Sequence, residues 1–340
     1  MKNKARYKVA VKCCTYNQAS YIKEALNGFV IQETDFPFVC CVIDDASTDG
    51  EQEVIKKYVA ENFNLSEPNI AYVTETDDAH ITFARHKNNK NCFFAVLYMK
   101  RNLYNDNQKK LDLISEWTEN SEYIAVCEGD DYWNDKNKIQ LQVAFLEANP
   151  KYGMCYTQCN YYYQNRGFLD TRPWGGTNEK FRQFMNSNTV PTLTAMWRTK
   201  LEIMYYIEVD PYSHGWMMGD YPRWIWLSHE SLIKFLPYTT GIYRVLPSSA
   251  SHSSDINVQI MFSKSSFDIR CFYEEFFNIP SGTYIKPDAF VKRKLYLYAI
   301  NHKVKEYFTL LFNNPMMIFN VKIISYLRYF LMKPKTSDEV

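Results

Sequence analysis

The chain has almost no excess of either charge. Its 340 residues include 39 Lys and Arg against 38 Asp and Glu, which gives a formal net charge of +1. A broad basic surface of the kind that attracts nucleic acid is therefore excluded, and any site for a polyanion must be local. We do not expect nucleic acid as a partner.

The sequence also lacks a long apolar run. In the last part of the chain, residues 257–332, the longest uncharged stretch, residues 307–321, contains Asn313-Asn314-Pro315 and falls short of the ~20 apolar residues that a membrane-spanning helix needs. At the start of the chain, the apolar residues that follow the basic first segment are soon interrupted by Lys12, which disfavours a secretory signal peptide. We expect neither a transmembrane segment nor secretion.

Two close Cys/His pairs, the spacing typical of a structural zinc site, are absent as well. Nine cysteines are present, an odd number, and four of them form the adjacent pairs Cys13-Cys14 and Cys40-Cys41 inside apolar runs. Neighbouring side chains of a strand point to opposite faces, so both members of each pair are expected to be buried thiols. Free buried thiols are typical of a reducing compartment, which predicts a cytoplasmic protein.

The first ~150 residues alternate strand-like and helix-like patterns, as in a parallel sheet covered by helices. Strands are predicted at residues 7–14, 38–43, 69–73 and 123–127, and helices with one apolar face at residues 22–29 and 54–59. With 46% hydrophobic residues the chain can bury a large core. The predicted fold class is α/β, with a Rossmann-like, mostly parallel sheet flanked by helices.

Local signals refine this outline. Ser20 is the expected N-cap of the first helix, and Asp49 with Gln52 is expected to form a capping box on the second. Residues 74–120 form a long polar connection with one helix at 111–117, which indicates an insertion or part of a binding site. A helix over 136–148 and a strand over 152–157 should follow.

The second half of the chain is aromatic and then helical. Trp174, Trp197, Trp216 and Trp224 belong to a series of aromatic residues that either pack in a core, the commoner use, or stack on sugars. Residues 257–332 show mostly helical patterns in which basic residues flank apolar ones. These helices either pack on the domain or lie on a membrane or a partner. The predicted domains are 1–254 and 255–340, with a frayed tail over 335–340.

Three carboxylates cluster in the hexapeptide Glu128-Gly129-Asp130-Asp131-Tyr132-Trp133, directly after the apolar run 123–127. Like charges this close resist joint ionisation unless a cation neutralises them. Hard oxygen ligands favour Mg²⁺ or Mn²⁺, which usually also bind water and substrate phosphate oxygens. Taken alone, the segment is equally compatible with an acidic turn that caps the next helix.

Polar residues also follow the first two predicted strands. The first strand ends in Thr15-Tyr16-Asn17-Gln18, and the second ends in Asp44-Asp45-Ala46-Ser47-Thr48-Asp49. Ligands of open α/β sheets bind at the carboxyl ends of the strands, where Glu128–Asp131 is also expected to lie. Turn and cap residues would explain one such ending, whereas three together favour a binding site.

In this combination the sequence resembles the inverting family 2 glycosyltransferases of the GT-A fold over roughly the first 250 residues. The resemblance implies that Thr15, Tyr16 and Asn17 bind the nucleotide, with Tyr16 stacked on the base. Asp44 or Asp45 would accept a hydrogen bond from the base, with Ser47 in the same turn. The motifs do not distinguish between the two aspartates.

The family's metal motif usually begins with Asp, whereas Glu128 stands first in this chain. Asp130 is therefore the expected metal ligand. Glu128 would bind the metal through water or contact the ribose, and Asp131 would contact the donor or orient its neighbours. The resemblance further implies that Arg244 pairs with the diphosphate and that His252 completes the shell of the metal, and a structural role is the alternative for each. The Tyr132-Trp133 continuation resembles bacterial members that act on surface polysaccharides.

An inverting displacement also needs a base for the acceptor hydroxyl. Asp220 lies in the segment His214-Gly215-Trp216-Met217-Met218-Gly219-Asp220, which resembles the part of the family that carries this base. The alternative for Asp220 is an N-cap before Pro222, near the first turn of a helix. The Gln-x-x-Arg-Trp segment of processive synthases is absent after Asp220, which favours the addition of a single sugar.

The predicted function is therefore metal-dependent transfer of a hexosyl or N-acetylhexosaminyl group from a nucleotide-diphosphate sugar, with a UDP-sugar favoured. The expected acceptor is a glycan or a lipid-linked glycan, in polysaccharide or glycolipid synthesis, with peripheral contact at the inner face of the membrane through the C-terminal helices. One alternative is a non-catalytic scaffold of the same fold. The other is a sugar-1-phosphate nucleotidyltransferase, which the absence of a Gly-rich, Arg-containing loop after the first strand disfavours.

Overall fold

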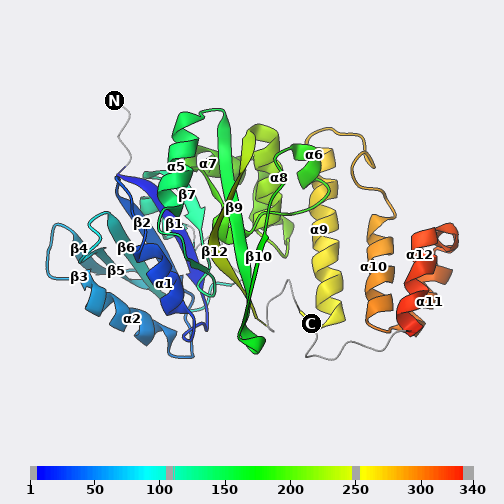
Figure 1. Ribbon diagram of the computed structural model, residues 1–340, viewed down its shortest axis with the longest axis horizontal. Helices are drawn as coiled ribbons and strands as arrows, with labels where there is room; N and C mark the ends of the chain where they lie inside the picture. Colours follow the sequence, from blue (N-terminus) through cyan, green and yellow to red (C-terminus); the bar gives the residue numbers. More distant parts are fainter. Residues whose placement is uncertain (1–5, 105–109, 111, 247–252, 332–340) are drawn as a thin grey trace. The chain divides into compact units, whose positions relative to one another are not determined.

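The computed structural model describes residues 6–104, 110, 112–246 and 253–331, and Figure 1 follows the chain through them. The expected frayed tail at 335–340 lies outside these residues. By its internal contacts the chain divides into two compact units. The first comprises residues 1–214 and 226–245, and the second comprises residues 215–225 and 246–340.

One mixed sheet dominates the first unit, with the strand order β3-β5-β6-β2-β1-β7-β11-β9-β12-β8. Its centre consists of four parallel strands, β6, β2, β1 and β7, and antiparallel pairs lie on both sides of them. This arrangement confirms the predicted α/β class. The central strands are β1 Tyr7–Thr15, β2 Phe38–Asp44, β6 Cys92–Met99 and β7 Ser121–Val126.

The segment expected to be one long polar connection contains sheet strands. After β3 Phe63–Asn64 come β4 Ala71–Glu75, β5 Ala79–His86 and β6. The strand predicted at residues 69–73 exists as β4, but it pairs antiparallel with β5, and β6 takes the parallel place beside β2. The helix expected at 111–117 is the single turn α4 Ser115–Thr118, and Leu111 lies outside the described residues.

Helices cover both faces of the central strands. Val9, Val11 and Cys13 of β1 share a buried core with α1 Ile22–Val30, α2 Glu51–Asn62 and α5 Lys138–Ala148. On the opposite face Lys12 pairs with Glu202 of α7 Thr199–Val209. This alternation follows from the period of two in a strand, so that one β1 sequence serves two helical layers.

Both helices exist, but Ser20 is not the N-cap of α1 and Asp49 with Gln52 does not form a capping box, although Asp49 Oδ1 accepts from the Glu51 N–H at 3.1 Å. The N-cap of α1 is Tyr21, which makes no side-chain cap bond, and the N-cap of α2 is Gly50. Gly50 has φ +91°, a left-handed conformation that suits glycine. The side chain of Gln52 turns instead to the sheet, where its Nε2 donates to Asp44 Oδ1 at 2.7 Å.

The remaining elements of the first unit extend the sheet beyond β7. They are β8 Tyr132–Trp133, β9 Tyr152–Tyr163, η1 Gln164–Arg166, β10 Phe168–Trp174, α6 Phe181–Phe184, η2 Thr192–Thr194, β11 Met196–Arg198, η3 Pro211–His214 and β12 Leu232–Val245. The predicted helix at 136–148 is confirmed as α5, and the strand predicted at 152–157 is the first half of β9. Trp197, Trp224 and Trp226 are fully buried, which confirms a core use for these three residues, whereas Trp174 is 38% exposed.

The second unit is helical, as the sequence predicted for its C-terminal part. It contains α9 Ile256–Phe276, α10 Ala289–Ile300, α11 Val304–Phe312, η5 Pro315–Phe319, α12 Val321–Tyr326 and η6 Leu327–Leu331. A small core of Leu295, Ala299, Tyr307 and Ile323 joins α10, α11 and α12. Among the described helices, none has the length and apolar character that crossing a bilayer requires.

Candidate active site

The three polar strand endings meet at one edge of the sheet. Thr15 is in register with Asp44, and the Asp45 N–H donates to the Thr15 carbonyl at 3.0 Å. On the other side of β1, the Gly129 N–H donates to the Cys14 carbonyl at 3.1 Å. The expected convergence of the endings is confirmed, because β1 lies between β2 and β7 with all three strands parallel.

Gly129 allows the acidic loop to approach β1 closely. A Cβ atom at this position would lie 2.3 Å from Thr15 Oγ1 and 2.6 Å from Gln18 Oε1. Distances this short are not tolerated by non-bonded atoms, so only glycine fits without movement of its neighbours. The glycine between Glu128 and Asp130 is thus required by packing against the end of the first strand.

Glu51, the first residue of α2, connects the loop after β1 with the loop after β2. The sequence analysis did not identify it as part of the site. Its carboxylate accepts from the Thr15 hydroxyl, from the Gln18 N–H at 2.8 Å and from the Ser47 hydroxyl at 2.8 Å. The side chain is fully buried, and burial raises the pKa of its carboxyl group. An acidic residue in a first helical turn usually indicates only a favourable helix dipole, so the sequence carried no specific signal.

Asn17 and Ser47 hold the same two loops together from the outside. The Asn17 N–H donates to Ser47 Oγ at 2.9 Å, and Asn17 Oδ1 accepts from the Thr48 N–H at 2.8 Å. Asn17 has φ +54° and Ala46 has φ +61°, so each loop turns through a left-handed residue. Both residues predicted to bind nucleotide from these loops therefore have structural contacts.

The two candidate aspartates differ in what their oxygens bind. Asp45 accepts from the Leu103 N–H at 2.7 Å and from the buried ammonium group of Lys110 at 2.9 Å. Asp44 Oδ1 accepts from Gln52, but Asp44 Oδ2 is buried without a hydrogen-bond partner among the described residues. Lys110 was not among the predicted residues, because its polar surroundings in sequence contain no motif.

Tyr16 follows the buried Thr15 and is 47% exposed, an unusual exposure for a large aromatic side chain at a strand end. Its ring is therefore accessible to a planar ligand. Thr15, by contrast, is buried and donates to Glu51. Of the two residues that the resemblance assigned to the nucleotide, Tyr16 has the exposed surface for it.

The acidic loop has three carboxylates in three different environments. Asp131 is buried, and Asp130 and Glu128 are half-buried. Burial raises the pKa of Asp130, and burial with repulsion from Asp130 raises that of Asp131 well above its ordinary range. Glu128 Oε2 accepts from the Cys14 N–H at 3.3 Å, and Gln18 bonds to the Asp130 side chain.

Arg244 of β12 holds this loop in place. Its N–H donates to Asp131 Oδ1 at 2.7 Å, and its Nε donates to the Asp130 carbonyl at 2.8 Å. The guanidinium group also binds the side chains of Glu24 and Gln164 and is almost fully buried. Its carbon lies 4.7 to 5.6 Å from the centres of three aromatic rings, those of Tyr21, Tyr132 and Tyr162. These contacts support a role in loop geometry, while contact with a diphosphate stays a prediction.

Trp133 anchors the end of the same loop. Its indole N–H donates to the Leu193 carbonyl at 2.7 Å, and its ring packs edge-on against Phe29 of α1. β8 pairs with β12 through Trp133 and Gly241. The Tyr132-Trp133 dipeptide thus fixes the C-terminal end of the acidic loop through these contacts.

The carboxylate of Asp130 is a suitable ligand for a hard divalent cation. Asp130 has a half-buried carboxylate whose ionised form is disfavoured by burial, and its acidic neighbours add no compensating charge. One or two carboxylates plus substrate phosphates are the usual ligands of Mg²⁺. Within the described residues, no three His, Cys, Asp or Glu side chains are grouped as a metal cage. His252, the third predicted ligand, lies outside the described residues.

Asp220 is the first residue of α8 Asp220–Glu230, in the second unit of the chain, which agrees with a position at a helix start. Nearby, the Met217 N–H donates to Ser265 Oγ at 2.9 Å, and the Tyr273 hydroxyl donates to the Pro222 carbonyl at 2.8 Å. Both bonds tie this segment to α9. Helix α9 therefore positions the residue that the resemblance assigns as base.

The N-terminal part of the chain is similar to a known protein family. Residues 11–93 match the model of the family described as "Glycosyl transferase family 2", in agreement with the family that the motifs resemble. Curated relatives include the uncharacterized proteins Rv1520 of Mycobacterium tuberculosis and Mb1547 of Mycobacterium bovis, each 31% identical over 157 residues. That alignment covers 46% of this chain and 36% of each relative, so the chain spans about a third of their length.

Solved structures with a similar course of the chain include two of S. aureus TarS 1–349. The complex with UDP is 18% identical with a TM-score of 0.46 and covers 91% of both chains. The complex with UDP-GlcNAc is 16% identical with a TM-score of 0.47 and covers 91% of this chain and 92% of that one. The mannosyltransferase PcManGT from Pyrobaculum calidifontis, in complex with GDP-Man and Mn²⁺, is 14% identical with a TM-score of 0.46 and covers 96% and 86%.

Proposed function

We propose that this chain, whose residues 11–93 match the model of glycosyl transferase family 2, transfers one sugar from a nucleotide-diphosphate donor to an acceptor hydroxyl with inversion. The observation that carries this proposal is the meeting of the strand-one, strand-two and acidic-loop endings at one sheet edge, with hydrogen bonds from Asp45 to Thr15 and from Gly129 to Cys14. The same edge carries the exposed ring of Tyr16, directly after β1, and the half-buried carboxylate of Asp130, in the loop after β7. A surface for the base and a carboxylate for the cation that binds the diphosphate are thus combined.

In the donor complex, Tyr16 stacks on the base, and Asp44 rather than Asp45 accepts its N–H. Asp45 already has one backbone donor and one ammonium donor, whereas Asp44 Oδ2 is a buried acceptor without a partner among the described residues. A buried acceptor left unpaired costs free energy, and a donor from the ligand would remove that cost. UDP is the favoured nucleotide.

Asp130, assisted by Glu128, would hold the divalent cation, Mn²⁺ or Mg²⁺. The cation supplies, when bound, Lewis-acid stabilisation of the charge on the leaving diphosphate. Arg244 and Gln18 keep the loop and the Asp130 side chain in position through their hydrogen bonds. Asp131, which is buried and bonded to the Arg244 N–H, orients the loop rather than binding the cation.

Asp220 accepts the proton of the acceptor hydroxyl. The acceptor oxygen then bonds to the anomeric carbon as the bond from that carbon to the diphosphate oxygen breaks, so that one displacement inverts the centre. General-base catalysis of this kind contributes about 10²- to 10⁴-fold. A hexosyl or N-acetylhexosaminyl group is the proposed cargo, and a glycan or lipid-linked glycan of surface polysaccharide or glycolipid synthesis is the proposed acceptor.

The test is a donor screen with the purified chain, UDP- and GDP-sugars, and either Mn²⁺, Mg²⁺ or EDTA. We expect metal-dependent release of UDP from at least one UDP-sugar, and about a tenfold weaker UDP affinity in Asp44→Asn, the loss typical of one hydrogen bond to a charged group. Asp268→Asn, an exposed carboxylate paired with Lys264, is the matched control. Nucleotide binding without any release, across all donors and acceptors tried, would favour the scaffold instead.

A further inference from the structure

The last part of the second unit exposes large apolar side chains to an unusual degree. Four of them are about four-fifths exposed: Phe312 at 82%, Met316 at 77%, Phe319 at 80% and Val321 at 79%. Leu331 is 91% exposed. Apolar side chains this exposed and this close in sequence are typical of an interaction site. We call the exposed side chains of residues 304–331 the C-terminal surface.

The region from α10 to the end of the described chain is basic, unlike the chain as a whole, and residues 304–331 contribute three of its basic residues, Lys305, Lys322 and Arg328. From the start of α10 at Ala289 to Leu331 there are seven basic residues and one acidic residue, Glu306, whereas the whole chain has a net charge of only +1. The basic residues are Lys292, Arg293, Lys294, Lys303, Lys305, Lys322 and Arg328. An excess of about six positive charges on 43 residues favours a partner with negative charge.

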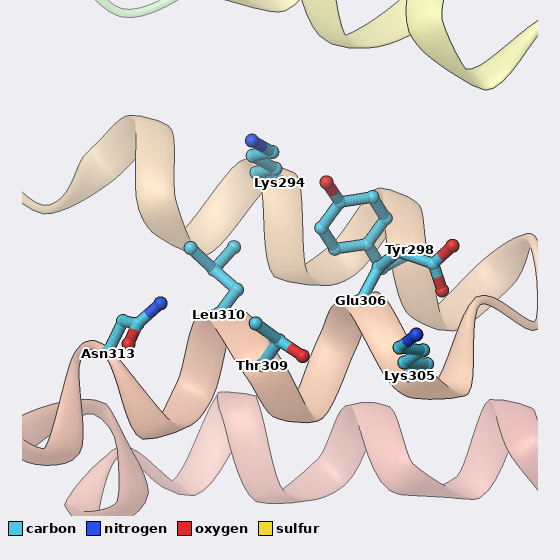
Figure 2. A pocket seen from close by; sticks show the side chains of 7 residues that line it. All are labelled: Lys294, Tyr298, Lys305, Glu306, Thr309, Leu310 and Asn313. Carbon is cyan, nitrogen blue, oxygen red and sulfur yellow. The ribbon is translucent and has the colours of Figure 1, made fainter.

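A groove of about 480 Å³ lies between α10 and α11, and two of these lysines line it. Figure 2 shows Lys294 and Tyr298 on α10 and Lys305 on α11, with Glu306 also on α11. The remaining lining residues are Thr309, Leu310 and Asn313. The lining combines two ammonium groups, hydroxyl groups and an amide with one carboxylate, that of Glu306, so it has a net positive charge that favours a phosphate group.

The groove and the apolar side chains occupy adjacent stripes of α11. Val304, Phe308 and Phe312 recur every four residues and are 47%, 41% and 82% exposed. The next residue after each, at positions 305, 309 and 313, lines the groove. Residues four apart lie on one helix face, and consecutive residues are displaced by about 100°. One helix therefore presents an apolar stripe beside a basic, polar one.

We propose that the C-terminal surface docks on an anionic lipid bilayer, with the apolar stripe and η5 in the acyl boundary and the groove lysines at headgroup phosphates. Short amphipathic helices with basic flanks bind membranes in this interfacial manner. A second copy of the chain is the weaker occupant, because a symmetric interface would place this basic surface against itself. The docking is independent of the transfer reaction.

Vesicle flotation of the full chain tests the proposal. We expect binding to vesicles of 70% phosphatidylcholine and 30% phosphatidylglycerol, weak binding to pure phosphatidylcholine, and loss of binding as NaCl rises from 0.1 to 0.5 M. Phe312→Asp/Phe319→Asp and Lys305→Glu/Lys322→Glu/Arg328→Glu should each reduce binding at least tenfold. The corresponding controls are Ile207→Asp, 75% exposed on α7, and the exposed Lys57→Glu/Lys90→Glu/Lys200→Glu, both of which should bind like wild type.

Two outcomes would overturn the proposal. One is equal binding of the chain to neutral and anionic vesicles, or to neither. The other is sedimentation of the wild-type chain as a dimer that the Phe312→Asp/Phe319→Asp variant dissociates, without vesicle binding, which would assign the surface to a second copy. Circular dichroism of each variant confirms that the substitutions have left the helices folded, as their exposure predicts.

Discussion

The sheet edge of the first unit and the C-terminal surface of the second unit use their side chains in opposite ways. At the sheet edge, polar groups are buried and paired over short distances, as Glu51 with Thr15, Gln18 and Ser47 and Asp45 with Lys110 illustrate. On the C-terminal surface, the apolar side chains of Phe312 and Phe319 are largely exposed. The sheet edge is thus held by hydrogen bonds and ion pairs between particular atoms, whereas the C-terminal surface presents apolar side chains to solvent.

This difference teaches how each region should respond to change. Buried hydrogen bonds are sensitive to single atoms, because a donor or acceptor left unpaired incurs its desolvation cost. Exposed apolar area contributes little to the stability of the isolated chain and is used only when a partner covers it. Substitutions at the sheet edge should therefore affect folding and nucleotide binding, whereas those on the C-terminal surface should affect neither.

The largest expected effect is that of a substitution at Asp220. This residue belongs to the second unit by its contacts, and our proposal assigns it the role of general base. Asp220→Asn should lower turnover by about 10²- to 10⁴-fold, the contribution of a general base. The affinity for UDP, measured by calorimetry, should not change. If Asp220→Asn turns over like wild type, another residue is the base and the assignment is wrong.

Gly129→Ala tests how closely the acidic loop must approach β1. The added Cβ would meet Thr15 and Gln18 side-chain atoms at 2.3 and 2.6 Å, so one of the two loops must move. We expect a loss of about 1–3 kcal/mol in the free energy of unfolding, as for other overpacked sites, together with weaker nucleotide binding. Gly219→Ala, where a Cβ meets nothing within 4 Å, serves as the control in the same denaturation experiment. Equal stability of the two variants would contradict the close approach.

Glu51→Gln tests the connection between the two strand-end loops. Glutamine keeps one acceptor oxygen, so either the Thr15 hydroxyl loses its acceptor at Oε1, or the Gln18 N–H and the Ser47 hydroxyl both lose theirs at Oε2. A buried unpaired donor costs about 1–3 kcal/mol, and we expect a loss of that size in urea unfolding with an increase in KM for the donor. Turnover at saturating donor should change little, because Glu51 positions the loops. A selective loss of kcat would instead indicate contact with the reacting atoms.

Phe312→Asp/Phe319→Asp should have the smallest effect on the isolated chain. Both side chains are about four-fifths exposed, so the free energy of unfolding, measured in urea, should change by less than about 0.5 kcal/mol. Donor hydrolysis in the absence of lipid should equal that of wild type. A large loss of stability would mean that these residues pack inside the molecule, and the contrast between the two regions would disappear.

Much of the fold was predictable from local patterns. Alternation and apolar runs identified β1, β2, β7, α1, α2, α5 and the helical C-terminal region, because these elements bury one face or a continuous strand. The strand β6 was missed even though residues 92–99 form an apolar run bounded by Asn91 and Lys100. The many polar residues on either side of that run led to the interpretation of the whole segment 74–120 as a connection. Its role beside β2 depends on pairing across the sheet, which a local pattern does not contain.

The site divides in the same way. Thr15, Asp44, Asp45 and Glu128–Asp131 were recognisable because each follows a strand, and parallel strands bring their carboxyl ends to one edge. Glu51, Gln18 and Lys110 were not recognised as parts of the site. Their significance comes from partners on other elements, and the same residue types are common in helix starts and loops.

What the sequence by itself determined is which residues end the central strands and with what chemistry, because backbone alternation and strand length are local properties. Only the tertiary structure decided which of those residues are paired and which remain available. Lys110 reaches Asp45 across 65 residues of chain, and Arg244 reaches Asp131 across 113. Contacts over such separations form only when the sheet has assembled, since the packing of distant strands and loops fixes the positions of both partners.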